Sequence, residues 1–468
     1  MKIRTLFFAY ACAGLGVLPL NAQEYAPQPS VAAQAALPPM TMALTGDSII
    51  TQRLSPYREP EFLKLIELVR AADVAFTNVE MLFHDFEGYP SVVSGGTYMR
   101  AEPALAKELA WAGFALGACA NNHTGDYSVE ALFSTDRALT AAGIVHAGIG
   151  ENLQQAREAR FVETASGRVA LVSCASTFTV HSIAGRQRSD MKGRPGLSPL
   201  RVETSYTVDA DTLAQVRALA AKLPPGAEAT GRTAGTAGTD EVVFQGNRFV
   251  LGEKFATVRT PLPSDLEEIA RTVRDAKTMA RHVIVSLHCH EYNPDDRKAP
   301  PDFYVAFAHA MIEAGASVVT GSGPHVLRGV ELWRGKPIFY SLGDFIMQND
   351  TVLRQPQDNY ELQGLGSEAR VGEFNAKRTA NDTRSWPATR EMWESVVAQA
   401  SFKGDKLTEI HLVPITLGFR QPAGVRGRPM LASPADAEKI LADLARLSAP
   451  FGTKIENRNG VGSVVLPP

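Results

Sequence analysis

The chain has 468 residues, enough for one large domain with insertions or for two ordinary domains. Hydrophobic residues make up 45%, charged residues 21%, and the formal net charge is −3. This balance gives no electrostatic reason to expect nucleic acid, so we predict no such partner. A polyanionic substrate would have to be held by local Arg, Lys or metal.

The first 22 residues are typical of a secretory signal peptide. Lys2 and Arg4 precede an apolar stretch at 5–20, and Ala22 ends an acceptable cleavage site. The stretch is too short to span a membrane, and no later segment is long enough to do so. We therefore predict an exported protein, periplasmic or extracellular, with no transmembrane span after cleavage; an uncleaved anchor is the alternative. Residues 23–40 read as a flexible lead-in.

Three of the four cysteines remain after removal of the signal. They are Cys119, Cys174 and Cys289, each at the end of an apolar run. An odd number in an exported protein leaves at least one free thiol. We expect buried core residues, with metal ligation as the alternative for Cys119 and Cys289.

Strands and helices alternate through the first half of the chain. Apolar patterns predict strands at 41–47, 73–80, 113–120 and 144–147, helices at 60–72, 102–113 and 128–142, and a hairpin at 160–173. This alternation indicates an α/β layered fold.

The second half is less regular. Residues from about 185 to 260 form an insertion rich in Gly, Thr, Ala or Pro, with one helix at 211–223; whether it is a lid or a decoration is open. A helix capped by Ser264 or Asp265 follows, then a strand at 282–288, a helix at 302–314 and strands at 316–321 and from 336. Residues 349–394 read as an irregular surface excursion. A hairpin at 396–414 and a helix at 434–447 belong to a C-terminal part, 395–468, that completes the domain begun at 41–348.

Six apolar segments end in metal-ligating or proton-carrying side chains. The endings are Gly46-Asp47, Asn78 with Glu80, Asn121-Asn122-His123 with Asp126, His288 with His290 and Glu291, His325, and Gly343-Asp344. In an open α/β sheet the carboxyl ends of strands converge on the ligand crevice. Six such endings therefore predict one shared site.

The donor types indicate a metal centre. Carboxylate, carboxamide and imidazole suit Mn²⁺, Zn²⁺ or Fe, with Mg²⁺ and Ca²⁺ as further candidates, and the sequence does not distinguish them. A metal there can polarise a carbonyl or phosphoryl oxygen and activate water. The chain has no phosphate-binding Gly-Lys-Ser/Thr loop, no dinucleotide-binding glycine fingerprint and no nucleophile elbow.

These segments resemble the capsule-synthesis protein family (CapA) of poly-γ-glutamate capsule biosynthesis. The resemblance covers roughly residues 41–350 and rests on LTGD at 44–47, ANNHTGD at 120–126, VSLH at 285–288 and FYSLGDF at 339–345. That family is similar in fold to the calcineurin-like metallophosphatases, so the resemblance implies a four-layer αββα sandwich with a metal at the strand ends.

The resemblance also assigns residues to roles. It implies metal ligation by Asp47, Glu80, Asn122, His288 and His325, with His290 and Asp344 as further candidates. It implies catalytic roles for His123 as proton carrier, for Asp126 as its orienting partner, and for Glu291. Substrate contacts are expected from Asn78, Glu331 and Arg100, for which an ordinary surface charge is the alternative.

Three positions depart from the family patterns. Ile49 stands where metallophosphatases have the His of Asp-x-His, as is usual in the capsule family. Gly323 stands where the family has a His, and His290 is an additional imidazole that we expect either to replace it or to point off the other face of the strand. Asp344 stands where the family has Asn, which adds a negative charge.

The function predicted from these features is metal-dependent hydrolysis or transfer at an amide or phosphoester of a cell-surface polymer or peptide. The resemblance implies poly-γ-glutamate handling and, as partners, the capsule-synthesis machinery. Two alternatives stay open: a non-catalytic accessory protein of polymer synthesis or export, and a metal-independent peptide epimerase using His123 and Asp47.

Overall fold

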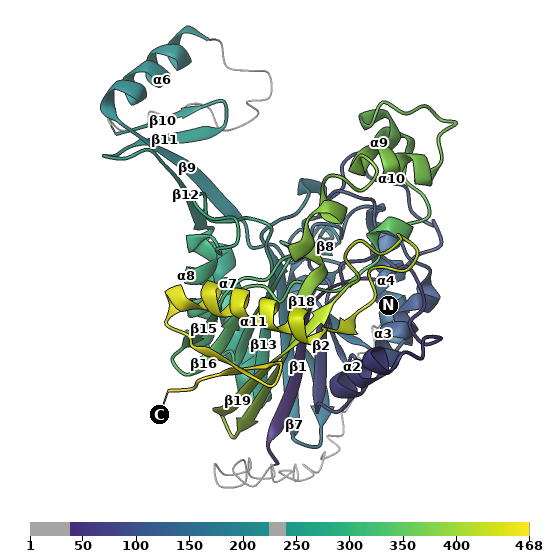
Figure 1. Cartoon of the computed structure of the whole chain (residues 1–468). Coiled ribbons are helices and arrows are strands. Elements are labelled where there is room, and N and C mark those ends of the chain that lie inside the picture. Colours follow the sequence, from purple (N-terminus) through teal and green to yellow (C-terminus); the bar gives the residue numbers. More distant parts are fainter. Residues whose placement is uncertain (1–37, 224–239, 468) are drawn as a thin grey trace, which may run out of the picture. The chain divides into compact units, whose positions relative to one another are not determined.

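The computed structural model describes residues 38–223 and 240–467. The predicted signal peptide, and all of the predicted lead-in except its last three residues, lie outside the described residues. The described chain is a mixed α/β structure (Figure 1), so the predicted α/β class is confirmed. Within these residues no helix has the length and hydropathy needed to cross a membrane.

The larger sheet has ten strands with β1 (Met40–Ile49) at its centre. On one side of β1 the strands β2 (Val74–Asn78), β3 (Leu116–Ala118) and β4 (Val145–Ala147) follow in parallel, and β17 (Asp344–Met347) also pairs with β1 in parallel. On the other side lie the antiparallel strands β18 (Glu394–Lys403), β19 (Lys406–Thr416), β20 (Met430–Leu431), β22 (Val461–Val464) and β21 (Ile455–Arg458). The hairpin predicted at 396–414 is confirmed as β18–β19.

The smaller sheet has six strands. Its order is β15 (Val330–Trp333), β16 (Lys336–Phe339), β14 (Val318–Ser322), β13 (His282–His288), β7 (Gly167–Ala175) and β6 (Arg160–Thr164). The four strands from β16 to β7 are parallel, and β13 and β14 are buried along their whole length, as their continuous β-branched sequence indicates.

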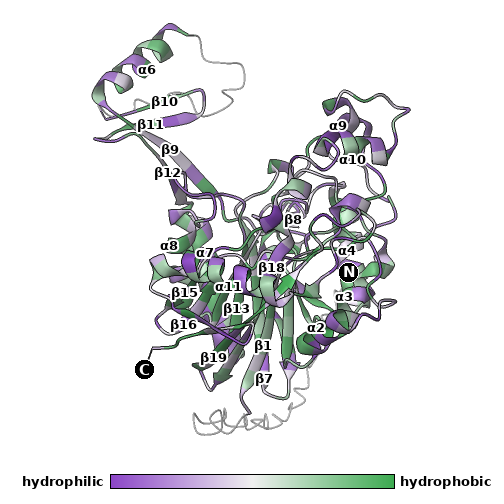
Figure 2. Ribbon diagram, in the orientation of Figure 1, coloured by the Kyte–Doolittle hydropathy of each residue, from purple (hydrophilic) through white to green (hydrophobic). Residues whose placement is uncertain are grey.

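Apolar side chains hold the two sheets together. Met42, Leu44 and Phe76 of the larger sheet belong to one buried cluster with Leu171 and Ile284 of the smaller sheet. In Figure 2 these central strands are predominantly hydrophobic. Helix α11 (Pro434–Ser448) adds Ile440, Leu441, Leu444 and Leu447 to the same cluster.

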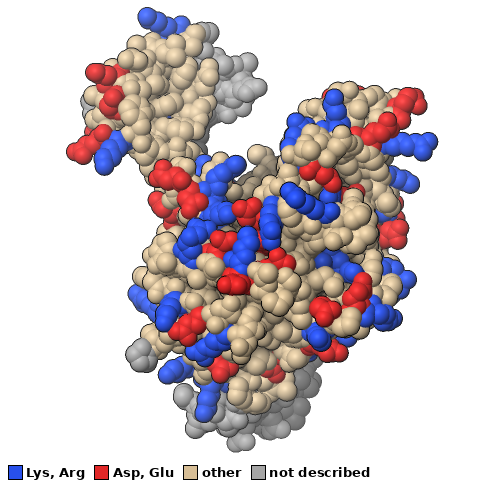
Figure 3. Space-filling view, in the orientation of Figure 1, with Lys and Arg blue, Asp and Glu red and all other residues tan. Residues whose placement is uncertain are grey.

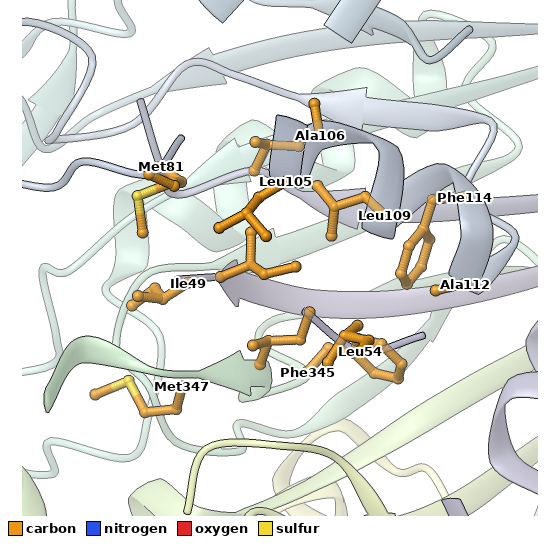
Figure 4. Packing of buried hydrophobic residues seen from close by; sticks show 14 of the residues in the cluster. Ile49, Leu54, Met81, Leu105, Ala106, Leu109, Ala112, Phe114, Phe345 and Met347 are labelled. Atoms are coloured by element: carbon orange, nitrogen blue, oxygen red, sulfur yellow. The ribbon is translucent and has the colours of Figure 1, made fainter. Parts of the chain in front are cut away.

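Helices cover the outer faces of both sheets. The larger sheet packs against α2 (Pro60–Arg70), α3 (Ala106–Ala112) and α4 (Ser128–Ala141), and the smaller sheet against α7 (Pro263–Met279) and α8 (Asp302–Glu313). Helix α2 buries positions at helical spacing, Phe62, Leu65, Ile66 and Val69. Figure 4 shows the contact beneath α3, where Leu105 and Leu109 pack toward Ile49 and the ring of Phe114 meets Phe345 edge-on at 5.2 Å.

The start of α7 corrects one expectation. Neither Ser264 nor Asp265 caps the helix, because Leu262 is the N-cap and Pro263 occupies the first turn. The Asp265 carboxylate is instead buried and accepts hydrogen bonds from Arg157 and Arg201, the latter through Nε at 2.7 Å. The long-range ion pair was invisible to a local capping rule.

Two segments are more ordered than the sequence patterns predicted. The insertion contains a separate four-stranded sheet of β9 (Val202–Val208), β10 (Glu241–Phe244), β11 (Asn247–Leu251) and β12 (Ala256–Pro261), beside the expected helix, α6 (Ala210–Lys222). Its strands are largely exposed, so they lack the hydrophobic runs that identify buried strands.

The excursion at 349–394 is also not simply irregular. It contains α9 (Gln357–Leu362) and α10 (Val371–Thr379) and buries the rings of Phe374, Trp386 and Trp393. Other short elements were not predicted: the β21–β22 hairpin, α5 (Leu153–Arg157), and the pairing of β5 (Ile149–Gly150) with β8 (Gly196–Leu197).

Candidate metal centre

The carboxyl ends of strands from both sheets meet at one buried cluster. The carboxyl ends of β1 and β2 and the amino end of β17 deliver side chains from the larger sheet, and the carboxyl ends of β13 and β14 deliver them from the smaller sheet. Six residues form three overlapping groups of three, and within each group the donor atoms lie within 4.8 Å of one another. The six are Asp47, Glu80, His288, His290, His325 and Asp344. We call these six residues the strand-end cluster.

Two glycines explain how Asp47 comes so close to Asp344. A Cβ at Gly46 would lie 1.7 Å from the carbonyl oxygen of Gly343, so only glycine fits where β1 and β17 approach. The backbone N–H of Asp47 donates to that same carbonyl at 3.0 Å. The Gly-Asp pairs at 46–47 and 343–344 thus allow this close approach and place two carboxylates at the sheet edge. Asp47 lies near the carboxyl end of β1, but Asp344 begins β17 rather than ending the strand predicted from 336, because that strand, β16, already ends at Phe339.

Glu80 lies in the middle of the cluster. Its side chain has no solvent exposure, and neither carboxylate oxygen has a hydrogen-bond partner among the described residues. Oε1 lies 3.7 Å from Nε2 of His123, 3.7 Å from Nε2 of His288 and 3.9 Å from Nε2 of His290, and Oε2 lies 3.8 Å from Nδ1 of His325. Burial, reinforced by Asp47, raises the pKa of Glu80 well above its ordinary value.

Asp47 is held in a fixed orientation. Its Oδ1 accepts from Asn78 Nδ2 at 2.7 Å, and its Oδ2 accepts from the backbone N–H of Gly323 at 2.8 Å. Burial raises the pKa of Asp47 to about 7, with the neighbouring His325 opposing that shift. Asn78 Oδ1 is buried without a partner and adds another free oxygen near the cluster.

The carboxamide of Asn122 faces His288. Asn122 Oδ1 lies 2.8 Å from His288 Nε2, and the other ring nitrogen of His288 lies 3.1 Å from the Ser322 hydroxyl. Burial, with the nearby imidazoles, lowers the pKa of His288 well below its ordinary value, so the ring is neutral and able to bind a metal.

His325 and Asp344 form a second pair on the opposite side. His325 Nδ1 lies 2.8 Å from Asp344 Oδ1, and Asp344 Oδ2 is buried without a partner. Burial alone would lower the pKa of His325, but Asp344, Glu80 and Asp47 raise it well above its ordinary value. His325 has a φ of +57°, an unusual conformation for a non-glycine residue that is found often at functional sites.

His290 points into the cluster. Its Nε2 lies 3.1 Å from His288 Nε2, and its ring centroid is 5.4 Å from that of His325. Gly323 has a φ of +111°, and a Cβ there would lie 3.0 Å from the backbone nitrogen of Cys289. Position 323 therefore suits glycine, which serves Asp47 through its N–H, while His290 brings an imidazole from the neighbouring strand.

His123 and Asp126 form a dyad beside the cluster. His123 Nδ1 lies 2.7 Å from Asp126 Oδ2, which also accepts from the backbone N–H of Met99 at 2.8 Å. This arrangement turns His123 Nε2 toward Glu80. A carboxylate that fixes one ring nitrogen leaves the other free to exchange protons.

Three predicted residues direct their side-chain hydrogen bonds away from both the strand-end cluster and the His123–Asp126 dyad. Glu291 Oε2 accepts from the hydroxyls of Ser176 at 2.9 Å and Thr177 at 2.6 Å, which anchors the turn after β13. Glu331, on β15 of the smaller sheet, contacts His309 of α8 and Tyr340, which follows β16. Arg100 is buried rather than a surface charge: it donates to His84 O and to Asp85, both at 2.8 Å.

Ile49 and the three cysteines lie in surroundings that do not suit a metal ligand. Ile49 packs in the apolar layer under the helices. Cys119, Cys174 and Cys289 are buried free thiols, and the described donor groups include none of them. Burial raises the pKa of the Cys289 thiol to about 12, which disfavours the thiolate that metals bind.

One contributor to the site was not predicted, the loop at 94–99. Gly95 donates through its N–H to Asp126 Oδ1 at 3.3 Å, and its carbonyl accepts from Asn122 Nδ2 at 3.2 Å. A Cβ at Gly95 would lie 2.5 Å from Asn122 Nδ2, so this close approach requires glycine. The Ser-Gly-Gly sequence at 94–96 was the available signal.

The donor set fits a divalent cation. Three carboxylates and three imidazoles converge. Three carboxylate oxygens, the two of Glu80 and Oδ2 of Asp344, are buried without a partner among the residues that the structure describes. Buried oxygens of this kind are costly unless a cation or donor compensates them. Mixed oxygen and nitrogen ligands suit Mn²⁺, Zn²⁺ or Fe²⁺, and the residues alone do not select one.

Comparison with known proteins agrees with the sequence resemblance. The family described as "Bacterial capsule synthesis protein PGA_cap" matches residues 41–349. The chain is 37% identical over 442 residues to an uncharacterized protein of Sinorhizobium fredii, covering 91% of this chain and 93% of that protein. It is 27% identical over 344 residues to a "Probable polyglutamine synthesis accessory protein" of Mycobacterium tuberculosis, covering 73% of this chain and 64% of that protein.

A further relative carries the name of the predicted family. The "Capsule biosynthesis protein CapA" of Bacillus anthracis is 22% identical over 314 residues, covering 66% of this chain and 59% of that protein. The predicted resemblance is therefore confirmed. The chain belongs to the bacterial capsule synthesis protein family, PGA_cap.

Proposed function

We propose that this protein is an exported, metal-dependent hydrolase or transferase that acts on an amide or phosphoester of a cell-surface polymer or peptide. The observation that carries the proposal is Glu80, a fully buried carboxylate that has four imidazoles around it and no hydrogen-bond partner in the described part of the chain. Poly-γ-glutamate is the polymer that membership of this family favours.

Asp47, Glu80, His288, His325 and Asp344 would hold the metal, with His290 as the imidazole that offsets glycine at position 323. Asn122 is placed to bind the metal or to orient His288. When bound, such a metal polarises a carbonyl or phosphoryl oxygen and lowers the pKa of a water.

The dyad of His123 and Asp126 would move the proton. Asp126 fixes Nδ1, so Nε2 faces the cluster and can give a proton to a leaving group or take one from an attacking water. Asp126 is itself oriented by the Met99 N–H, which restricts the ring to one position. Glu291, Glu331 and Arg100 are not in contact with this cluster, so roles for them at the reacting atoms have less support.

Two further features belong to the same proposal. We propose that the paired sheets with helices on their outer faces are the four-layer αββα sandwich of calcineurin-like metallophosphatases, supported by the three separate apolar layers. We also propose export, because residues 1–22 have the charge and apolar pattern of a signal peptide.

A non-catalytic accessory role is the second candidate. Gly323 replaces an imidazole of the family pattern, and the relative in Mycobacterium tuberculosis is named as an accessory protein. Such a protein would bind polymer without turning it over. A metal-independent epimerase is less favoured, because both oxygens of Asp47 already accept hydrogen bonds.

Elemental analysis combined with a substrate panel tests the proposal. The purified protein should contain a divalent metal and should cleave a γ-glutamyl amide or a phosphoester, and chelation should abolish the cleavage. A His123→Gln change should lower the rate by about 10²- to 10⁴-fold with metal content unchanged.

His146→Gln is the matched control, because His146 also pairs with an aspartate, Asp136, at 2.9 Å, away from the cluster. This variant should keep full activity. Polymer binding without turnover would instead support the accessory role, and solvent deuterium incorporation without cleavage would support an epimerase.

A further inference from the structure

Arg378 on α10 differs from most surface cations of this protein. In Figure 3, many Lys and Arg side chains stand beside Asp and Glu side chains. The Arg378 guanidinium instead lies 4.8 Å from the ring of Trp386 and 5.9 Å from that of Phe374, and its one hydrogen bond runs from Nη1 to the Thr97 hydroxyl. Within the described residues it has no ion-pair partner.

The acidic residue that most influences Arg378 is already engaged. Asp350 accepts hydrogen bonds from Arg426 Nε at 2.7 Å and from Trp386 Nε1 at 3.2 Å. Burial lowers the pKa of Arg378 despite Asp350, but the group stays charged at any physiological pH. A half-buried guanidinium with free donors and no ion-pair partner among the described residues is available to an anion.

The structure fixes Arg378 relative to the proposed catalytic dyad through the loop at 94–97. Thr97 accepts from Arg378, and two residues earlier Gly95 bonds to both Asn122 and Asp126. Between them, a Cβ at Gly96 would lie 3.7 Å from Arg378 Nη2 and 4.0 Å from His123 Cε1. Because Gly96 has no side chain, the space between the guanidinium and the imidazole is not filled by that residue.

The helix that carries Arg378 is held in place by contacts with Asp350. Arg426 bridges Asp350 and Asp382, with distances of 2.7 Å from Nε and Nη1, and Asn375 of α10 donates to the Asp350 carbonyl at 3.0 Å. The guanidinium is therefore pre-organised rather than swinging freely in solvent.

We propose that Arg378 is a substrate-binding residue that receives carboxylate or phosphate oxygens of the substrate beside His123. The planar guanidinium suits either anion, which it can bind through two parallel N–H bonds. This inference rests on the proposed function for the position of the reacting bond. It assigns a role to the segment after residue 349, which the family match does not cover.

The proposal also bears on Arg100, from which the sequence predicted a substrate contact. The strand-end cluster is strongly acidic, so an anionic substrate requires a nearby cation to offset Asp126 and the cluster carboxylates. Arg100 pairs with Asp85 and lies 4.4 Å from the ring of Phe86. Arg378 has no such carboxylate partner, so it is the better candidate for the anion contact.

Calorimetric titration of the full chain, with its native metal, tests the assignment. The probes are inorganic phosphate and the dipeptide γ-glutamyl-glutamate. Arg378→Met, which keeps an apolar chain against Trp386 and Phe374, should weaken binding of at least one probe by about 10- to 100-fold. Arg378→Lys should recover part of that loss because it restores the charge without the fork.

Lys377→Met is the matched control, since Lys377 is the exposed preceding residue on the same helix. It should change neither affinity by more than about twofold. Arg378→Gln keeps an N–H for Thr97 and removes the charge, so it should behave as Arg378→Met even if the methionine variant folds poorly. A loss for phosphate alone identifies a phosphoryl group, and a loss for the dipeptide alone identifies a carboxylate.

The proposal is overturned if wild type binds neither probe, or if Arg378→Gln binds both as wild type does. Metal content measured on the same samples tests the proposed function separately from the Arg378 assignment. A protein without metal that still loses anion binding on Arg378→Gln contradicts the hydrolase and leaves the Arg378 assignment standing.

Discussion

Glu80 and Glu331 are both buried glutamates beside histidines, yet their surroundings differ. Both oxygens of Glu331 lie 3.0 Å from His309 Nε2, and one also accepts from the Tyr340 hydroxyl at 2.5 Å. The oxygens of Glu80 have no hydrogen-bond partner within residues 38–223 and 240–467, and the imidazole nitrogens lie 3.7 to 3.9 Å away. Glu331 belongs to a closed polar network, whereas Glu80 belongs to groups of donor atoms that could hold a metal ion.

The difference shows which buried carboxylates maintain the fold and which serve a ligand. Asp265, also fully buried, resembles Glu331, because Arg157 and Arg201 satisfy its oxygens. Removing a partner from a closed network leaves groups uncompensated, while neutralising an open carboxylate removes a buried charge. Stability and metal affinity should therefore respond in opposite ways at the two kinds of residue.

The largest effect on stability is expected at Asp265. Asp265→Asn should lower the free energy of unfolding by about 3–5 kcal/mol, because it removes the buried carboxylate that pairs with both Arg157 and Arg201 and leaves Arg157, among the described residues, with Glu268 alone as an ion-pair partner. Urea denaturation measures the loss. Asp275→Asn, an exposed position on the same helix, is the control and should change stability by less than about 0.5 kcal/mol. Equal effects for the two variants would show that the Asp265 network does not stabilise the fold.

The next largest effect concerns metal affinity at Glu80. Glu80→Gln should weaken metal binding by more than about 100-fold, since the loss of even an outer partner of a ligand costs about 10- to 100-fold. Glu331→Gln should leave metal affinity unchanged. Titration with a chelator of known affinity gives both values. If the two variants bound metal equally well, the distinction between open and closed carboxylates would be wrong.

A smaller effect on stability is expected at Glu331. Glu331→Gln should destabilise the protein by about 1–3 kcal/mol, because the amide presents a donor to His309 or Tyr340, which are themselves donors. Metal-free Glu80→Gln should be at least as stable as metal-free wild type. Thermal unfolding of the wild type and both variants, each freed of metal with a chelator, measures these differences. A metal-free Glu80→Gln variant that is less stable than wild type would contradict an open site.

Much of the fold was predictable from sequence, for a physical reason. Buried parallel strands such as β13 carry continuous apolar runs, and amphipathic helices such as α2 carry apolar residues at helical spacing. The exposed strands of the insertion bury too little to show either pattern. The helices after residue 349 depend on long-range contacts such as that of Arg426 with Asp350, which no local rule detects.

The cluster itself was predictable because strand ends of parallel sheets must meet at one edge. Asp47, Glu80, His288 and His325 follow from that rule. Glu331 was assigned from the family resemblance instead. A matching sequence position does not tell whether the carboxylate oxygens already have hydrogen-bond partners, as those of Glu331 do. The roles of these residues stay predictions until metal and substrate are measured.

The smallest expected effect is a change of stability with pH, to which the open site contributes. Burial raises the pKa of Asp47 from 3.8 to about 7, and it raises that of Glu80 as well. A group whose pKa is higher in the folded state binds more protons when the protein is folded. The free energy of unfolding therefore falls as pH rises through the range between its unfolded and folded pKa values. The raised pKa of His325 acts in the same direction above its ordinary 6.5.

The lowered pKa of His288 opposes this trend only below about pH 6.5, where the unfolded imidazole would be protonated. Metal-free protein should therefore be less stable near pH 8 than near about pH 6.5, and Asp47→Asn should reduce that difference. Added metal should reverse the slope, because it requires the deprotonated ligands. Urea denaturation of chelated and metal-loaded protein at both values measures this. If the metal-free protein were equally stable at both pH values, the pKa values of the cluster carboxylates would not be raised in the folded state. That result would contradict an open site.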